Sequence, residues 1–419
     1  MLAPGSKGWI NKYFDLERRN EFSLEFSVPK GLTRKEYVHL RFLRSGIVFG
    51  FPVKRIFANE LKDSKWTQNE KLKVLLFESL LLIYLMENSE EPLDPEKFKA
   101  SLLSFYAEHN ASGLSKVFGL FMKETPDERL ENILSQRLSV KSKLIEGQYW
   151  LGYLSNTFVY LDIVLYRNFL KNRKETLSNY NELANNALVA ITMAAYSDDI
   201  ITDQEKAMFK VFLSSANLKD SEERVAKLRF KHGASLADFS EIAKSNVLFR
   251  RFLIDITALT IFVNQERLPE EIQFFNEMCD FLDVPKKEVH NAMTMIENFV
   301  LQNSSQMSLL SSRSSYEKLY GSVSKRWIKV LSRNSDKLAL ELKESKELVQ
   351  LIRKSTSDEL SKEEKELVKS QFMDIVKSMP ALAIFMLPGG ALLLPLILKI
   401  IPDLVPSAFR DNELDDEPQ

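Results

Sequence analysis

Four carboxylate side chains lie within one short stretch of the chain, where their type and spacing could bind a metal ion or the N-terminus of a helix. Asp198, Asp199, Asp203 and Glu205 lie close together, and no cation occurs among them before Lys206. Carboxylates this close repel one another at neutral pH unless something positive offsets their charge. Two sources of positive charge are open: the free N–H groups at the start of the following helix, or a calcium ion bound by the carboxylate oxygens.

The spacing of this turn differs from that of an EF-hand loop. A loop beginning at Asp198 would need glycine at position 203 and glutamate at position 209, where the chain has Asp203 and Phe209. Thr202 and Glu205 are instead spaced as a capping box, in which each side chain binds the backbone N–H of the other. Helix capping is therefore the favoured interpretation, and calcium binding is the alternative.

Motifs for catalysis are absent from the sequence. It contains no glycine-rich phosphate loop, no G-x-S-x-G and no H-E-x-x-H. The histidines His39, His109, His232 and His290 are far apart, and we expect them at the surface or at the edge of the core. Cys279 is the only cysteine, which excludes a disulfide within the chain. Its helical spacing within FFNEMCDFL favours a small core residue over a nucleophile. We expect a protein that is not an enzyme and that uses no cofactor except, in the alternative above, calcium.

The composition is that of an ordinary globular protein built from helices. The 419 residues carry a net charge of −1, with 27% charged and 45% hydrophobic residues, which argues against sequence-specific binding of nucleic acid. Capping boxes at Thr67–Glu70 and Thr125–Glu128, and Pro95 after Asp94, mark helix starts. We predict an all-α fold, in which a multi-helix soluble body precedes one helical segment that inserts into a membrane near the C-terminus.

Two stretches of the N-terminal half have distinct patterns. Residues 148–170 are apolar nearly all round and predict a central helix, while Asp162 and Arg167 argue against a membrane span. Residues 21–57 are predicted to be the least helical part. Their cations favour a solvated face, with a patch for anionic lipid or RNA as the alternative. These cations are Lys30, Arg34, Lys35, Arg41, Arg44, Lys54 and Arg55.

The middle of the chain contains an internal repeat. One segment begins at Ile191 and the other at Ile256, and each pattern predicts an apolar helix, a short acidic turn and a second helix. The second helix ends near Leu218 in the first copy and near Leu282 in the second copy. The second copy also has Pro269 in the first turn of its second helix. Two helix pairs are therefore predicted in this region.

This layout resembles the tellurite-resistance TerB family, a compact all-helical domain with an A-x-A-D-G-x-I-x-x-x-E signature. In the first copy Ala195, Asp198, Ile201 and Glu205 fit the signature, whereas Asp199 replaces its glycine. The resemblance implies calcium or another metal at these turns. The ligands would be Asp198, Asp199, Asp203 and Glu205.

A long apolar run lies near the end of the sequence. Met379 to Leu398, MPALAIFMLPGGALLLPLIL, contains no charged residue. About twenty apolar residues in a helix span the roughly 30 Å hydrocarbon core of a bilayer. Pro388, Pro395 and Pro402 are spaced by seven residues, so in a helix they would interrupt backbone hydrogen bonds on one face. Gly389 and Gly390 would add a hinge. The run is predicted to span the membrane or to re-enter it as a hairpin, with a buried helix of a soluble core as the alternative.

The residues around this run carry a family resemblance. The D-x-x-K-x-x-P pattern from Asp374 to Pro380, the LLLP that ends at Pro395, and the LK-x-x-P-x-x-x-P-S-x-F pattern from Leu398 to Phe409 occur in order. They are similar to the membrane segment of the LETM family of the mitochondrial inner membrane. The order of the parts along the chain, a helical domain, a TerB-like domain, a linker and a LETM-like module, resembles that of bacterial LETM-related, biofilm-associated proteins. The membrane-segment residues singled out are Pro380, Pro388, Gly389, Gly390, Pro395, Lys399, Pro402 and Pro406.

The LETM resemblance implies cation/proton exchange and, for the domain after the membrane segment, ribosome binding. Ala391 stands where many eukaryotic members have a glutamate, which argues against exchange because an intramembrane carboxylate is the usual carrier. After Phe409 only the acidic tail DNELDDEPQ follows, in place of the large post-membrane domain of the family, which argues against ribosome binding.

These patterns predict an order of domains. Ser357 is expected to cap the last amphipathic helix before the membrane run. The N-terminus has neither an apolar signal segment nor an arginine-rich transit sequence, so the body is expected in the cytoplasm. The predicted parts are a helical domain of unknown type (1–175), a TerB-like domain (176–303), a Ser-rich linker (304–315), a LETM-like module (316–410) with the membrane segment at 379–401, and an acidic tail (411–419).

The leading hypothesis for function is a non-enzymatic scaffold or sensor, tethered at the cytoplasmic face of the cytoplasmic membrane, in envelope or biofilm physiology. Two alternatives are a component of cation/proton transport, for calcium or potassium, and a membrane tether that binds ribosomes. The lipid bilayer is the expected partner in each case. The ribosome, other envelope proteins and further copies of the chain are the other expected partners.

Overall fold

The computed structural model describes residues 1–28, 33–108, 124–138, 153–171, 180–197, 201–262, 269–285, 335–357 and 360–378, with isolated positions between 292 and 331. Within these residues every secondary-structure element is a helix, so the predicted all-α class is confirmed for this part. The chain divides into two units. Unit 1 comprises residues 1–26 and 38–296, and unit 2 comprises residues 27–37 and 297–419.

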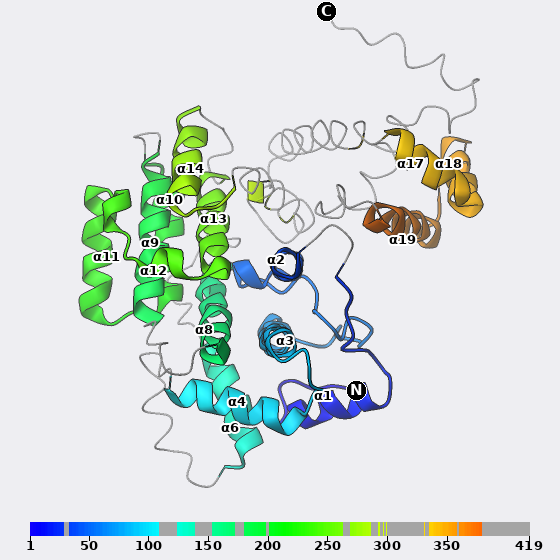
Figure 1. Cartoon of the computed structure of the whole chain (residues 1–419), viewed down its shortest axis with the longest axis horizontal. Helices are drawn as coiled ribbons and strands as arrows, with labels where there is room; N and C mark the ends of the chain where they lie inside the picture. The colour runs from blue at the N-terminus through cyan, green and yellow to red at the C-terminus, as the bar shows by residue number, and fades with distance from the viewer. Residues whose placement is uncertain are drawn as a thin grey trace, which may run out of the picture. The chain divides into compact units, whose positions relative to one another are not determined.

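The first half of unit 1 is a group of helices built around α3 (Figure 1). Capping boxes begin α3 and α6 as predicted: the Glu70 N–H donates to Thr67 Oγ1 at 3.2 Å, and the Glu128 N–H donates to Thr125 Oγ1 at 3.3 Å. The elements are α1 (Trp9–Arg18), α2 (Arg34–Ser45, of which residues 38–45 belong to this unit), the 3-10 helix η1 (Ile47–Phe49), α3 (Gln68–Glu87), α4 (Pro95–Glu108), α6 (Pro126–Arg137), the 3-10 helix η3 (Tyr153–Val159) and α8 (Tyr160–Lys171).

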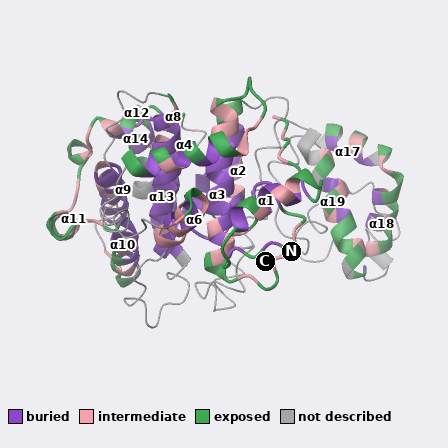
Figure 2. Cartoon of the chain, turned by 90° about the horizontal axis from the view of Figure 1, so that it is seen from below, coloured by how far each residue is buried: buried purple, intermediate pink, exposed green. Residues whose placement is uncertain are grey.

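The core of this half consists of apolar residues on all sides of α3, which Figure 2 shows as a largely buried helix. Aromatic rings from α1 and α4 pack around Phe77 of α3, with ring centroids 5.3 Å from Tyr13 and 5.5 Å from Phe98. Burial of such rings supplies much of the driving force for helix packing. The helices α6 and α8 also pack on α3, so α3 is the centre of this group.

Residues 148–170 were predicted to form one central helix, and their described part forms two helices instead. This part begins as the 3-10 helix η3 and continues as α8 from Tyr160. The helix is central, because α8 packs on α3 and also on α9 and α13 of the second half. Its two charged side chains are paired: Asp162 with Arg137 at 2.7 Å and Arg167 with Glu87 at 2.8 Å. Buried charges are tolerated only with such partners.

The second half of unit 1 contains both predicted helix pairs, α9–α10 and α13–α14. The helices α9 and α13 pack against each other, α10 and α11 pack on α9, and α14 packs on α13. The predicted starts at Thr202 and Pro269 are confirmed, since α10 has Thr202 as its N-cap and α14 begins at Pro269. The elements are α9 (Tyr180–Ala195), α10 (Asp203–Ala216), α11 (Asp220–His232), the 3-10 helix η4 (Leu236–Asp238), α12 (Ile242–Ser245), α13 (Val247–Phe262) and α14 (Pro269–Phe281).

The stretch 21–57 is more regular than its composition suggests, because residues 34–45 form α2. Its cations also do not form one solvated face. Arg55 is buried, and Arg41 lies over the Phe57 ring at 5.9 Å from the centroid. The stems and planar heads of these arginines pack on apolar surface, which the charge count alone does not reveal.

The described helices of unit 2 are α17 (Ser335–Glu344), α18 (Lys346–Ser357) and α19 (Lys362–Ser378), and each packs on the other two. The predicted linker 304–315, the membrane segment 379–401 and the tail 411–419 lie outside the described residues. The predicted boundary at 175/176 also falls in an undescribed stretch, and unit 1 runs across it. The domain boundaries remain predictions.

Candidate functional site

The three helices of unit 2 form a small module with its own apolar core. Each helix contributes two buried side chains at a spacing of four residues, which places both on one helix face. These are Leu338 and Leu342 of α17, Leu348 and Ile352 of α18, and Val368 and Phe372 of α19. Burial of these faces against one another leaves the charged faces of the helices outward.

Polar bonds fix α19 against the turn between the other two helices. Ser345 Oγ donates to Gln371 Oε1 at 3.2 Å, and the Gln371 amide donates in turn to Glu347. At the other end of α19, Lys354 Nζ lies 2.6 Å from Glu364 Oε1. These bonds join side chains from separate helices, so they set the orientation of α19 within the module.

The cap of α19 differs from the prediction, because Ser361 caps the helix and Ser357 is the last residue of α18. The Glu364 N–H donates to Ser361 Oγ at 3.2 Å, and the Ser361 N–H donates to Glu364 Oε2 at 2.9 Å. The bonds from Lys354 and from the Ser361 N–H lower the pKa of the Glu364 carboxyl. Two serines compete for this role in the sequence, and only Ser361 has a glutamate three residues later.

The outer surface of α19 is charged. Lys365 is exposed, and Lys369 lies 3.3 Å from Glu366 Oε2 one turn away. Lys365 and Lys369 are spaced by four residues, so they share one face of the helix. A face of this kind suits contact with a charged partner surface, through ion pairs rather than covalent chemistry.

Comparison with protein families gave a match in this module. Residues 360–419, which begin just before α19, match the family model of the LETM1-like ribosome-binding domain (LETM1-like, RBD). The match supports a LETM-related protein. It agrees with the resemblance seen at residues 374–409, and of the matched residues the structure describes 360–378. Neither the curated proteins nor the solved structures gave a match.

The predicted membrane residues all lie beyond the described part of α19. Pro380, Pro388, Pro395, Pro402 and the other members of that set fall outside the described residues, as does Ala391. In the portion of the chain that the structure describes, none of the helices combines the length and the apolar character needed to cross a bilayer. The membrane segment therefore remains a prediction from sequence.

The acidic turn is only partly described, and its two described carboxylates have separate roles. Glu205 is buried and accepts the Thr202 N–H at 2.8 Å, which completes the capping box of α10. Asp203 is exposed, and its Oδ1 lies 3.1 Å from Lys206 Nζ. Asp198 and Asp199 fall outside the described residues, and the described ones contain no group of acidic, histidine or cysteine side chains placed to hold a metal. The capping role of Glu205 is confirmed, and calcium binding remains untested.

The histidines and the cysteine differ in their surroundings. Cys279 is buried, as expected for a small core residue. His232 is exposed at the end of α11, whereas His39 is buried and its Nε2 lies 2.8 Å from Asp255 Oδ2. The expectation of a surface or core-edge position is therefore wrong for His39, because a distant aspartate supplies the partner that lets it enter the core. His109 and His290 lie outside the described residues.

A buried carboxylate in α3, which the sequence analysis did not single out, holds the loop before that helix. Glu78 accepts the N–H groups of Phe57 at 3.1 Å and Ala58 at 3.0 Å, and it also accepts the Ile56 N–H and the Tyr13 hydroxyl. Burial raises the pKa of the Glu78 carboxyl, and these hydrogen bonds oppose the rise. A lone acid within the apolar run LKVLLFESLLLIYLM was the available signal for such a buried site.

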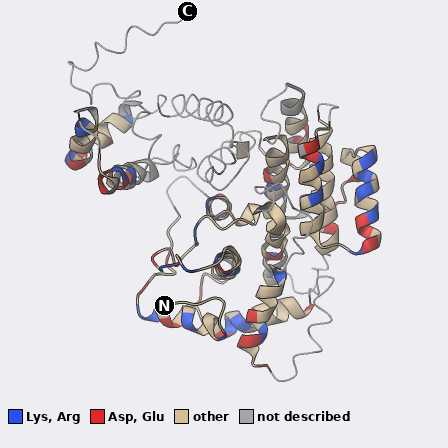
Figure 3. Ribbon diagram, turned by 180° about the vertical axis from the view of Figure 1, so that it is seen from behind, with Lys and Arg blue, Asp and Glu red and all other residues tan. Residues whose placement is uncertain are grey.

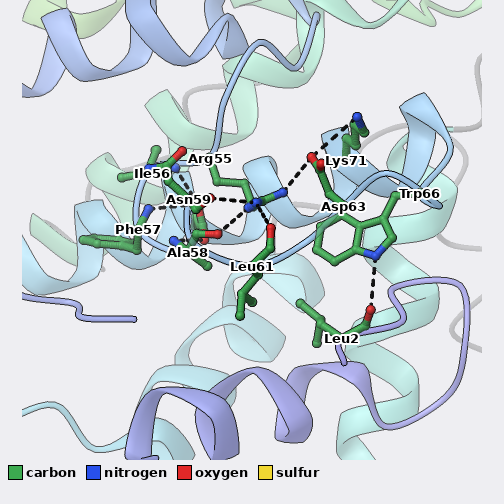
Figure 4. Close-up of polar contacts among 11 residues, drawn as sticks. Leu2, Arg55, Ile56, Phe57, Ala58, Asn59, Leu61, Asp63, Trp66 and Lys71 are labelled. Atoms are coloured by element: carbon green, nitrogen blue, oxygen red, sulfur yellow. Dashed lines mark hydrogen bonds and ion pairs between the residues drawn. The ribbon is translucent and has the colours of Figure 1, made fainter. Parts of the chain in front are cut away.

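Arg55 fixes the carbonyl groups of the same loop, as Figure 4 shows. Its guanidinium donates to the carbonyl oxygens of Ala58, Asn59 and Leu61, pairs with Asp63 at 2.8 Å and lies over the Trp66 ring. The network leaves a pocket of about 230 Å³ beside the loop. Lys54, Lys71 and Asp63 are its other charged lining residues. Because the loop itself uses four of the five N–H donors of Arg55, we assign this arginine a structural role.

Proposed function

We propose that this chain is a non-enzymatic, LETM-related protein that binds ribosomes through its C-terminal module and holds them at a membrane. The observation that carries the proposal is the match of residues 360–419 to the LETM1-like ribosome-binding domain. The predicted membrane segment 379–401 lies within the matched residues, so the same module supplies the proposed ribosome contact and the proposed membrane contact.

The match ranks the ribosome hypothesis above the two others. It supports a family named for ribosome binding, and it extends through the acidic tail. A general scaffold or sensor has no comparable observation behind it. Cation/proton exchange still lacks the intramembrane carboxylate that such carriers use, since position 391 is alanine.

Charge on α19 gives a physical route to ribosome binding. Ribosomes present a dense array of RNA phosphates, and lysines that contact phosphate release counterions, which makes the affinity depend steeply on salt. Lys365 and Lys369 share a helix face within the matched residues. We propose that this face of α19 contributes to the ribosome contact.

Ribosome sedimentation with the full chain in detergent tests the proposal. Lys365→Glu with Lys369→Glu should weaken binding by about tenfold or more, because reversal of two charges removes two phosphate contacts and adds repulsion. The matched control is Lys337→Glu with Lys346→Glu, the same charge change at exposed positions of the same module outside the matched residues. The proposal fails if the wild-type chain does not sediment with ribosomes at low salt, and the role of α19 fails if both double variants bind equally.

A further inference from the structure

The helix α11 presents an unusual outer surface. Val225 and Leu228 are 51% and 58% exposed, and they are two of the five large hydrophobic side chains exposed among the described residues. They are three positions apart, so they lie side by side on one helix face. The two aliphatic side chains form a small apolar surface, which would gain free energy if a partner covered it.

The inward face of α11 is firmly held, so its outer face is a fixed surface of unit 1. Ala226 is buried, and the Phe230 ring stacks on Phe209 of α10 with centroids 3.9 Å apart. The Tyr196 hydroxyl donates to the Phe230 carbonyl at 2.8 Å, and the Asn181 amide donates to Glu222 at 3.0 Å. One end of α11 is therefore tied to α9 and the other to Tyr196, the residue after α9, and Figure 1 places α11 at the edge of this group of helices.

Cations surround the exposed aliphatic pair. In Figure 3 the ribbon of α11 is coloured for basic residues along most of its length and for acidic residues at one end. Lys227 is paired with Glu223, whereas Arg224 and Lys231 form no ion pair within the described part of the chain. A helix with 3.6 residues per turn places Arg224, Leu228 and Lys231 on adjacent positions of the outer face. The outer face thus combines two apolar side chains with positive charge that has no ion-pair partner among the described residues.

We propose that the outer face of α11 is a contact surface for an anionic lipid bilayer. Val225 and Leu228 enter the interface between headgroups and acyl chains, while Arg224, Lys227 and Lys231 lie among the negative headgroups. Interfacial helices bind by this combination of apolar burial and attraction to anionic lipid. The inference rests on the membrane placement in the proposed function and adds a second contact, made by unit 1.

The aliphatic pair decides between lipid and RNA as the occupant. Phosphates of RNA would attract the cations equally well, but RNA backbone offers nothing to two exposed aliphatic side chains. A bilayer interface accommodates both features at once. We therefore assign the surface to lipid, and RNA and a second copy of the chain become contrary outcomes of the test.

A polarity-sensitive fluorophore on the full chain reports the contact. Ser221→Cys places the label on the exposed side of α11 and keeps both aliphatic residues, and the one native cysteine, Cys279, is buried. Vesicles of phosphatidylcholine with phosphatidylglycerol should raise the emission by roughly twofold or more and shift it to the blue, as the label leaves water. Vesicles of phosphatidylcholine alone should give a much smaller change. Ser64→Cys, an exposed serine on a loop of the same unit, is the control position.

Two variants separate the contributions, and several outcomes overturn the inference. In the labelled chain, Val225→Ser with Leu228→Ser and, separately, Arg224→Gln with Lys231→Gln should each abolish most of the emission change. The inference is wrong if the label stays in water while the chain sediments with anionic vesicles and still binds ribosomes, a result that leaves the proposed function intact. It is also wrong if RNA alone, or higher protein concentration alone, produces the change. Failure of the chain to sediment with any vesicle overturns both the inference and the proposed membrane placement.

Discussion

At the scale of single residues, Glu78 takes over the hydrogen bonding of a loop that has no regular structure. Its carboxylate accepts N–H groups from three consecutive residues, Ile56 to Ala58, and a hydroxyl from Tyr13. Buried N–H groups without an acceptor are costly, so the loop depends on this one side chain. The same loop carries Arg55, whose guanidinium satisfies the carbonyl groups next to it.

Replacement of Glu78 tests this dependence. Glu78→Gln keeps the size of the side chain but turns an NH₂ group towards backbone donors, so we expect the free energy of unfolding to fall by about 2 kcal/mol or more. Urea unfolding of the full chain measures the change. Glu60→Gln, an exposed glutamate of the same loop, should change the stability by less than about 0.5 kcal/mol. Equal effects of the two variants would contradict the assigned role of Glu78.

The pKa of Glu78 adds a signature in pH. Burial raises this pKa above the unfolded value, so the folded state holds the proton more tightly than the unfolded state does. The stability that this carboxyl contributes is therefore greatest in acid and falls as the pH rises through the raised pKa. The difference in unfolding free energy between the wild type and Glu78→Gln should be larger at about pH 5 than at about pH 7. A difference that is constant over this range would contradict a titration of Glu78 within it.

At the scale of secondary-structure elements, capping boxes begin several helices of this chain. The box of α10 includes Glu205, which is also one of the four carboxylates considered as calcium ligands. Glu205 closes the box with Thr202 and is buried, while Asp203 pairs with Lys206. Each of these carboxylates thus already has a positive partner, either a backbone N–H or a lysine. This arrangement favours capping as the reason for the acidic turn.

Melting of the full chain separates capping from calcium binding. Thr202→Ala should lower the free energy of unfolding by about 1 kcal/mol, because one helix N–H loses its acceptor. Millimolar calcium should leave the melting temperature unchanged, since an ion that binds only the folded state would raise it. A rise that is abolished by Asp198→Asn with Asp199→Asn would instead establish the calcium site.

At the scale of the whole molecule, the proposed function needs one chain to bind a ribosome and a bilayer. The helices of unit 1 and the module of unit 2 each have their own core, so each can hold a fixed binding surface. The segment 379–401 is the part predicted to enter the membrane, and it follows α19 directly in sequence. Membrane attachment and ribosome contact are therefore predicted close together along the chain.

Extraction with alkaline carbonate tests the membrane part of this arrangement. The full chain should remain with the membrane pellet, because the apolar run inserts into the hydrocarbon core. Leu387→Lys with Leu392→Lys should release it, since lysine near the centre of a membrane helix costs about 2.5–3.5 kcal/mol. Leu340→Lys with Leu367→Lys, at exposed apolar positions of α17 and α19, is the matched control and should stay in the pellet. Full release of the wild-type chain would overturn membrane insertion.

The sequence by itself determined the helical class and the starts of α3, α4, α6, α10 and α14. Capping acts between residues three positions apart, and a proline in the first turn acts within one turn, so both are visible in a short window of sequence. The start of α19 was harder to predict, because both Ser357 and Ser361 could cap this helix. Only Ser361 has a glutamate three residues later. The match to residues 360–419 then supported the LETM resemblance seen in the same part of the sequence.

Only the tertiary structure decided which polar residues are buried and which partners they have. Glu78 meets the loop at 56–58, Arg137 meets Asp162, and His39 meets Asp255, although 216 positions separate the last two along the chain. A buried charged or polar group is stable only beside a partner, and the packing of whole helices determines which partner arrives. The same holds for the outer face of α11, since local pattern cannot tell which side of an amphipathic helix stays uncovered until its neighbours are in place.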